Sequence, residues 1–256
     1  MKLSLDKKII KDYKSPAQKA RLLTENWVSD QIFCPNCGHL KINQYPNNKP
    51  AVDFYCSGCK ENFELKGKQN TIGAKVVDGA YRTMMERLQS RENPNLFLFT
   101  YDFEKLEVLD FLVVPKHFFT PKIIERRKPL GPKAVRAGWV GCNISLLNLP
   151  ESGKIFFVKN QIIESKEKVL SEWKKTLFLK DENEISEKGW LLDIMKCLDK
   201  LGKKEFTIND VYSFEEYLSR LHPENKHIKD KIRQQLQTLR NKNYLDFISK
   251  GLYRLK

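Results

Sequence analysis

Two Cys-x-x-Cys pairs constrain the fold of this chain more than any other feature of its sequence. Cys34 and Cys37 form the first pair, Cys56 and Cys59 form the second, and eighteen residues lie between the pairs. This spacing is within the range of four-cysteine zinc sites. In a reducing compartment, paired cysteines are more often metal ligands than disulfides. We therefore expect all four to bind one structural zinc ion; the alternative is a pair of redox or incidental motifs.

The chain is strongly basic. Its 256 residues include 46 Lys and Arg against 32 Asp and Glu, a net charge of +14. Such a balance favours a polyanionic partner, which could be nucleic acid or a membrane surface. No run of eighteen apolar residues is present, and the N-terminal stretch lacks the apolar segment of a signal peptide. We expect a soluble, cytoplasmic protein that is monomeric in solution.

Acidic and basic residues alternate along the segment that follows the second cysteine pair. In an extended strand Glu64 and Lys66 point to one face, while Phe63 and Leu65 point to the other. The apolar face can enter the core, which leaves the charged face for chemistry. A hairpin closed at its tip by the second cysteine pair would bring Asp53 beside Glu64.

This arrangement has the composition of a metal-dependent phosphodiesterase site. Asp53 and Glu64 are natural ligands for Mg²⁺, and the carbonyl of Leu65 could add a third oxygen. Lys66 could orient an attacking water or stabilise charge on the phosphate. The PD-(D/E)XK nucleases have this pattern, in which ten residues separate Asp from Glu and one residue separates Glu from Lys. Here Val52 stands before the aspartate in place of the proline. We predict Asp53, Glu64 and Lys66 as catalytic residues; on its own, such alternation is more often a solvated strand face.

The first two thirds of the chain read as a mixture of helices and strands. Helical spacing of apolar residues predicts helices, and apolar runs rich in aromatic and β-branched residues predict strands. The expected helices are 16–31, 78–89 and 166–176, and the expected strands are 95–101 and 106–115, forming a buried hairpin, and 154–158. Cys142 and Cys197 stand alone and are expected to be buried.

The last third differs in pattern. After a polar segment (181–188) that we expect to be a linker, apolar spacing predicts a helix over 190–201, a second from its cap at Thr207 to Leu221, and a third over 228–239. The chain then ends in two short strands around a glycine turn. Three helices followed by a hairpin is the order of a winged-helix domain.

The third helix carries polar side chains opposite its apolar stripe. Asn and Gln pair with adenine in the major groove, and Arg pairs with guanine. The predicted base-reading residues are Arg233, Gln234, Gln237, Arg240 and Asn241. Arginines outside this helix are expected to contact phosphates and supply affinity, namely Arg126, Arg127, Arg136 and Arg254.

Several segments resemble the DpnI-like methyl-directed restriction endonucleases of the PD-(D/E)XK superfamily. They are CPNCG, AVDFYCSGC, FELK, DGAYRTMMERLQ, RAGWVGCNI and KIRQQLQTLR, and the resemblance covers most of the chain. It implies an α/β (α+β) PD-(D/E)XK endonuclease domain with an inserted four-cysteine zinc site (1–180), the linker (181–188) and an α+β winged-helix DNA-binding domain (189–256).

The resemblance also implies an activity. It implies a type II site-specific deoxyribonuclease that uses Mg²⁺ to cut both strands of DNA at GATC sites carrying N6-methyladenine. Trp139, on a glycine-flanked loop beside basic residues, is our candidate for the apolar surface that contacts the methyl group, although a tryptophan is more often part of a core. Two alternatives stay open: a zinc-containing winged-helix DNA-binding regulator without catalysis, and a nuclease of this fold with another recognition sequence.

Overall fold

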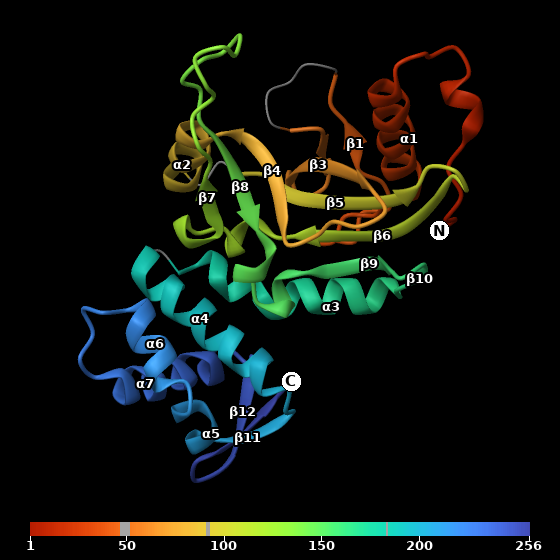
Figure 1. Cartoon of the computed structure of the whole chain (residues 1–256). Helices are drawn as coiled ribbons and strands as arrows, with labels where there is room; N and C mark the ends of the chain where they lie inside the picture. The colour runs from red at the N-terminus through yellow and green to blue at the C-terminus, as the bar shows by residue number, and fades with distance from the viewer. Residues whose placement is uncertain (47–51, 91–92, 183) are drawn as a thin grey trace. The chain divides into compact units, whose positions relative to one another are not determined.

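The chain folds into two compact units. The computed structural model describes residues 1–46, 52–90, 93–182 and 184–256 (Figure 1). The first unit comprises Met1–Asn148 and Gly153–Lys174, and the second comprises Leu149–Ser152 and Lys175–Lys256. Among the described residues, no helix has both the length and the apolar character needed to cross a membrane.

A seven-stranded sheet forms the centre of the first unit. Its strand order is β1-β2-β3-β5-β6-β9-β10, and the pairing is antiparallel except between β3 and β5. The strands are β1 (Asn43–Gln44), β2 (Phe54–Tyr55), β3 (Asn62–Gln69), β5 (Asn95–Asp102), β6 (Glu107–Val114), β9 (Ile155–Lys159) and β10 (Ile162–Ile163). Two parallel neighbours need a crossover connection, and here it runs through β4 (Lys75–Ala80) and α2 (Tyr81–Ser90).

The core lies around β5 and β6, which form the predicted hairpin. All of β5 except its last residue is buried, as expected for a strand covered on both faces. Phe63 of β3 stacks on Phe97 of β5 at 4.5 Å between ring centroids, and Trp27 meets Phe99 edge to face at 5.1 Å. Trp27 belongs to α1 (Pro16–Gln31), the helix predicted over 16–31. These aromatic contacts join β3 to β5 and pack α1 against β5.

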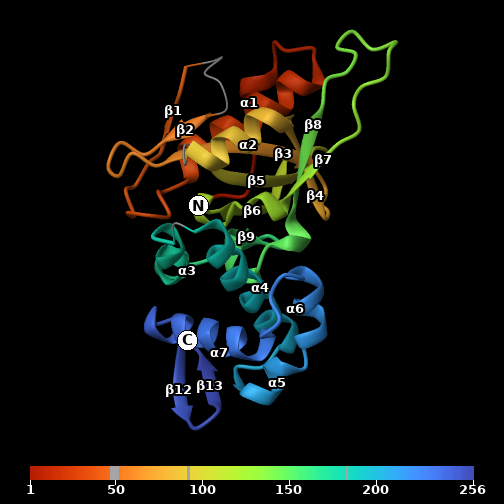
Figure 2. The same ribbon diagram turned by 90° about the vertical axis from the view of Figure 1, so that its left-hand side faces the viewer.

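A second, three-stranded sheet in this unit has the order β4-β8-β7, with β8 (Gly141–Ser145) and β7 (Ile124–Arg126). Figure 2 shows the loop between β7 and β8 as a long excursion from the unit. The prediction of a helix over 78–89 is wrong at its start, because residues 78–80 belong to β4 and α2 begins at Tyr81. A bulge at Gly79 interrupts the pairing between β4 and β8.

The remaining elements of this unit are mostly short. The predicted helix over 166–176 is α3 (Lys166–Thr176). Single 3₁₀ turns lie at η1 (Lys7–Ile10), η2 (Lys116–Phe118), η3 (Pro121–Ile123) and η4 (Leu146–Asn148), while η5 (Glu151–Gly153) lies where the two units meet in sequence and η6 (Leu177–Lys180) lies in the second unit.

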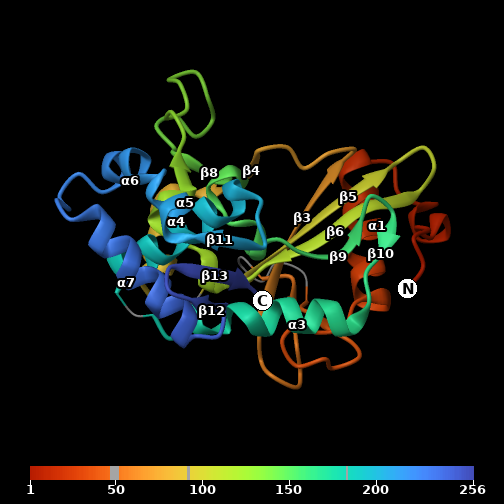
Figure 3. The same ribbon diagram turned by 90° about the horizontal axis from the view of Figure 1, so that it is seen from below.

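The second unit combines helices with a small three-stranded sheet (Figure 3). Its helices are α4 (Ile185–Leu201), α5 (Ile208–Tyr212), α6 (Glu215–Leu221) and α7 (Ile228–Asn241); its strands are β11 (Glu205–Thr207), β12 (Leu245–Ser249) and β13 (Leu252–Leu255), in the order β11-β13-β12. The two units follow the expected order along the chain. The first is a mixed α/β core, and the second is a helical unit that ends in a hairpin.

Two details of the second unit differ from expectation. The helix predicted from Thr207 to Leu221 is two helices, because α5 ends at Tyr212 and α6 starts at Glu215. The segment expected to be a linker, 181–188, is helical from Ile185 onward, and its position 183 lies outside the described residues. Thr207 does cap α5, through a reciprocal capping box with Asp210.

Candidate active site and zinc centre

The sulfur atoms of the four clustered cysteines converge. The Sγ atoms of Cys34, Cys37, Cys56 and Cys59 all lie within 4.8 Å of one another, and the Cys34–Cys59 and Cys37–Cys56 sulfurs are each 3.5 Å apart. A tetrahedral zinc ion with Zn–S bonds of about 2.3 Å separates its sulfurs by about 3.8 Å, whereas a disulfide needs about 2.05 Å. The geometry therefore fits a four-thiolate zinc ion and not two disulfides.

Both cysteine loops adopt the same turn. In each loop the carbonyl of the first cysteine accepts a hydrogen bond from the amide four residues later, Gly38 to Cys34 and Lys60 to Cys56, both at 2.9 Å. That later residue has a positive φ in both cases, 73° at Gly38 and 62° at Lys60. Burial raises the pKa of the Cys34 thiol, so its thiolate needs a neighbouring cation, which zinc would supply.

The other cysteines and the nearby histidine are separate from this cluster. Cys142 and Cys197 are buried, as predicted. His39 lies next to the first loop, but its Nε2 atom is 3.1 Å from the hydroxyl of Ser57 and it is not part of the convergent group. The cluster packs against α3, where Trp173 donates its indole N–H to Asn36 at 2.9 Å.

The second cysteine loop connects β2 to β3 and sets the position of Asp53. Phe54 of β2 lies opposite Phe63 of β3, and the amide of Asp53 donates to the carbonyl of Phe63 at 2.9 Å. The Oδ2 atom of Asp53 accepts a hydrogen bond from the amide of Leu65 at 2.7 Å. The hairpin thus brings the Asp53 carboxylate to the backbone of β3 at Leu65, the residue that follows Glu64.

Glu64 and Lys66 lie on one face of β3, as the alternation of a strand requires. The Nζ atom of Lys66 is 2.6 Å from Glu64 and 2.9 Å from Asp78. Burial raises the pKa of Glu64, although the charge of Lys66 opposes the rise. Burial alone would lower the pKa of Lys66, but the charges of Glu64 and Asp78 raise it above its ordinary value, so the lysine is protonated at neutral pH.

Asp78 is the residue that sequence reasoning missed. Its side chain is only 8% exposed and comes from β4, in the other sheet of the unit. The segment DGAYRTMMERLQ contains it, but apolar spacing after Tyr81 led us to include it in a helix. The signal that could have identified it is Asp78-Gly79, a turn-prone dipeptide in front of a periodic run, which marks an element boundary.

The donor set suits a hard divalent cation. Glu64 and Asp78 both pair with Lys66, and Asp53 bonds the amide of Leu65 on the same strand, so the donors here are the carboxylate oxygens that Mg²⁺ prefers. Among the described residues, the four cysteines are the one group of three or more His, Cys, Asp or Glu whose ligand atoms already converge. Asp53 and Leu65 also line a pocket of about 420 Å³ against α1, together with Arg21, Thr24 and Glu25.

The basic loop between β7 and β8 places Trp139 on its return branch. Hydrogen bonds from Leu130 to Trp139 and from Gly138 to Leu130, both at 2.9 Å, hold the two branches together. The guanidinium of Arg136 lies 4.8 Å from the centroid of the Trp139 ring. Trp139 is half-buried, so it is neither a core residue nor fully in solvent. The other predicted loop contacts, Arg126 and Arg127, are exposed.

The predicted base-reading residues lie on the outer side of α7. Gln234, Gln237 and Asn241 are exposed, whereas Arg240 is half-buried with its guanidinium 3.3 Å from Asn241. Two of the predicted arginines are exposed but form ion pairs, Arg233 with Asp230 and Arg254 with Glu205, both at 2.7 Å. Gln235, between two predicted residues, is buried and bonds Glu187 at 3.0 Å.

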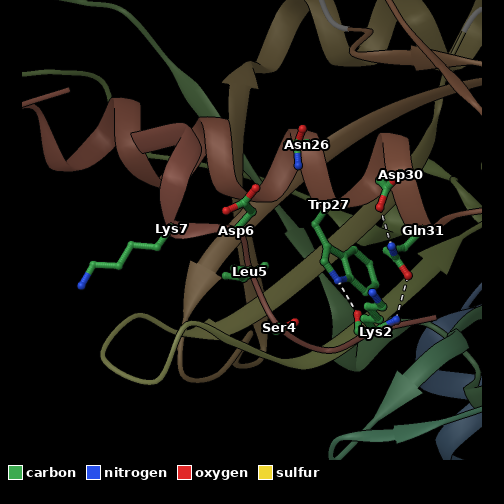
Figure 4. A pocket seen from close by; sticks show the side chains of 9 residues that line it. All are labelled: Lys2, Ser4, Leu5, Asp6, Lys7, Asn26, Trp27, Asp30 and Gln31. Carbon is green, nitrogen blue, oxygen red and sulfur yellow. Dashed lines mark hydrogen bonds between the residues drawn. The ribbon is translucent and has the colours of Figure 1, made fainter. Parts of the chain in front are cut away.

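A separate pocket of about 340 Å³ lies between the N-terminal segment and α1 (Figure 4). Trp27 donates its indole N–H to the carbonyl of Lys2, and the amide of Lys2 donates to Gln31, both at 2.7 Å. These bonds fasten the N-terminal segment to the helix. None of the predicted site residues lines this pocket.

Comparison with known families covers nearly the whole chain. Residues 1–182 match the DpnI family, described as the Dam-replacing family, and residues 186–255 match the Dam-replacing HTH domain. The chain belongs to the DpnI family. The predicted resemblance is confirmed, and with it the order of a DpnI domain followed by a helix-turn-helix domain. Membership in the DpnI family implies a nuclease that binds DNA.

Proposed function

We propose that this protein is a type II methyl-directed restriction endonuclease that uses Mg²⁺ to cut both strands of DNA at GATC sites carrying N6-methyladenine. The observation that carries the proposal is the position of Asp53, Glu64 and Lys66 on one zinc-closed hairpin in a chain of the DpnI family. We further propose a PD-(D/E)XK core, an endonuclease domain over 1–180, a winged-helix domain over 189–256, and action as a cytoplasmic monomer.

In this proposal Asp53, Glu64 and the carbonyl of Leu65 hold the catalytic Mg²⁺. When bound, the metal polarises the scissile phosphate and lowers the pKa of a bound water. The hydrogen bond from the Leu65 amide to Asp53 at 2.7 Å fixes the carboxylate beside that carbonyl. The zinc ion would take no part in the chemistry, since four thiolates leave it no open position.

Lys66 acts as a cation rather than as a base. Burial opposes its charge, but Glu64 and Asp78 raise its pKa above its ordinary value, which favours the ammonium form over the free amine that a base would need. An ammonium group can instead orient the attacking water and stabilise the charge that develops on the phosphate. This role needs Lys66 held in one place, and in this structure its ammonium is paired with Glu64 and Asp78.

Recognition would be divided between the two domains. Trp139 offers an apolar ring for the methyl group, and the guanidinium of Arg136 lies over that ring. On α7, Arg233, Gln234, Gln237, Arg240 and Asn241 would read base edges. Arg126, Arg127, Arg136 and Arg254 would contact phosphates, which supplies affinity without sequence choice.

The second candidate is a zinc-containing winged-helix regulator that binds DNA without cutting it. The arrangement around Lys66 argues against it, because a surface that only binds DNA gains nothing from carboxylates that repel phosphates. Glu64 and Asp78, with side chains 14% and 8% exposed, are also costly to bury unless they serve a purpose.

Digestion of paired plasmids tests the proposal. The same plasmid is prepared with and without adenine methylation at GATC and incubated with the purified protein in Mg²⁺ or in a chelator. We expect fragments only from the methylated plasmid with Mg²⁺, and none with Asp53→Asn. Equal cutting of both plasmids would refute methyl direction, and binding without cutting would favour the regulator.

A further inference from the structure

Asp78 has a position that the proposed catalytic residues do not explain. Its Oδ1 atom lies 2.9 Å from the ammonium of Lys66, which also pairs with Glu64 at 2.6 Å. Resting on the proposed function, we propose that Asp78 is a positioning residue. It holds the ammonium of Lys66 so that Glu64 can leave this lysine and bind the metal.

The fold delivers Asp78 to Lys66 from a different sheet. Asp78 lies on β4 opposite Cys142 of β8, and the bulge at Gly79 follows it directly. Bulges often occur beside active sites, where they redirect a side chain. Val76, two residues earlier on the same face, is buried. The ion pair between Asp78 and Lys66 therefore joins the three-stranded sheet to β3 at the catalytic face.

Without Asp78, Glu64 would face a conflict. Its Oε1 atom is 2.6 Å from the ammonium of Lys66, so lysine and metal compete for the same carboxylate. A buried ammonium with a single partner keeps that partner, because losing it leaves an uncompensated buried charge. With two partners, Lys66 can release Glu64 and remain paired with Asp78.

The same pair would set where the ammonium points. A lysine side chain is flexible, and the side chain of Lys66 is 27% exposed. After metal binding, Asp78 alone would hold the Nζ atom of Lys66 on the face of β3 that carries Glu64. Asp78 itself need not touch the metal or the DNA to have this effect.

Removal of the charge with little change of shape tests the proposal. The variants are Asp78→Asn, Asp78→Glu, and Glu125→Gln as a matched control, which breaks an ion pair between Glu125 and Lys75 in the same small sheet without touching Lys66. For each we would measure thermal unfolding, zinc content, DNA affinity, the single-turnover cleavage rate at saturating DNA, and Mn²⁺ affinity by electron paramagnetic resonance.

We expect Asp78→Asn to weaken Mn²⁺ binding and slow cleavage by about 10–100-fold, the usual cost of losing a group that orients a metal site. DNA affinity, zinc content and unfolding should match the control, and Asp78→Glu should recover part of the loss. Wild-type behaviour of Asp78→Asn, its unfolding, or a loss of zinc or DNA binding would overturn the proposal.

A double variant separates positioning from direct metal binding. In a Lys66→Met background the competition for Glu64 is absent, so adding Asp78→Asn should change Mn²⁺ affinity by about twofold or less, against about tenfold or more with lysine present. An equal loss in both backgrounds would make Asp78 a metal ligand and overturn its role as a positioning residue. If the wild type cuts no DNA, the proposed function fails, while the Mn²⁺ measurements still decide the role of Asp78.

Discussion

The indole ring of Trp139 lies against the α-carbon of Gly141. A β-carbon at position 141 would lie 2.8 Å from two carbon atoms of the ring, which is closer than such atoms approach one another. The ring also has the guanidinium of Arg136 at 4.8 Å from its centroid. The position of the proposed methyl-contacting ring thus depends on the absence of a side chain two residues later.

Gly141→Ala should therefore displace Trp139. The clash is with the far end of a half-buried side chain, so the ring moves and the fold survives, with a stability loss of about 1–3 kcal/mol at most. We expect the preference for methylated over unmethylated DNA to fall, as measured by the ratio of binding affinities. Gly131→Ala is the matched control on the same loop, because a β-carbon there meets nothing within 4 Å. Equal preference in both variants would contradict the role of Trp139.

Removal of zinc should abolish cleavage through lost geometry. The four cysteines close the hairpin that carries Asp53 and β3, and structural zinc sites contribute about 10–16 kcal/mol of apparent binding energy. Chelation should release zinc together with four thiols that react with a disulfide reagent. The two remaining cysteines, Cys142 and Cys197, should react slowly with the reagent at pH 8, because burial raises their pKa to about 11 and about 12. Full cleavage by the zinc-free protein would refute the structural role.

Two neighbouring glutamines on α7 should behave differently. Gln237 is exposed, so Gln237→Ala should leave stability unchanged and weaken binding to the specific site by about 1–3 kcal/mol. Gln235 is buried and bonds Glu187, so Gln235→Ala should lower the unfolding temperature. Binding isotherms on specific and scrambled duplexes, with thermal unfolding, compare the two. If Gln237→Ala binds both duplexes like the wild type, this face of α7 does not read bases.

Tyr244 should make the second unit sensitive to alkali. Burial raises the pKa of Tyr244 to about 12 from its ordinary value of 10.0. A group whose folded pKa is raised contributes stability that is present below its unfolded pKa and is lost as the pH rises through the folded value. Stability should thus fall between pH 10 and about 12, by on the order of 2 kcal/mol. Denaturant unfolding of Tyr244→Phe should show a shallower decline; an identical decline would contradict the assignment.

The features that local sequence patterns encode were predictable. The cysteine spacing identified the convergent cluster, helical periodicity gave α1 and α3, and two apolar runs gave the hairpin of β5 and β6. The alternation along β3 placed Glu64 and Lys66 on one face. Each of these depends on residues close together in sequence, where strand and helix periods act directly.

What was missed depends on pairing between distant segments. Asp78 is extended because β4 pairs with β8, more than sixty residues later. The spacing of apolar residues near Asp78 contains no information about so distant a partner strand. The break between α5 and α6 at Ser213 and Phe214 also went unnoticed, since the apolar spacing continues across it. The sequence did not predict β11, the third strand of the small sheet. It is only three residues long and is defined by its pairing with β13.

The most direct test of the account compares two short duplexes that differ only in the N6-methyl group of the GATC adenines. Single-turnover cleavage in Mg²⁺ gives one rate for each duplex, with Asp53→Asn as the inactive reference. The account predicts that the methylated duplex is cut faster by about tenfold or more, the discrimination that a good base contact provides. Equal rates for the two duplexes, or cleavage that persists in Asp53→Asn, would contradict it.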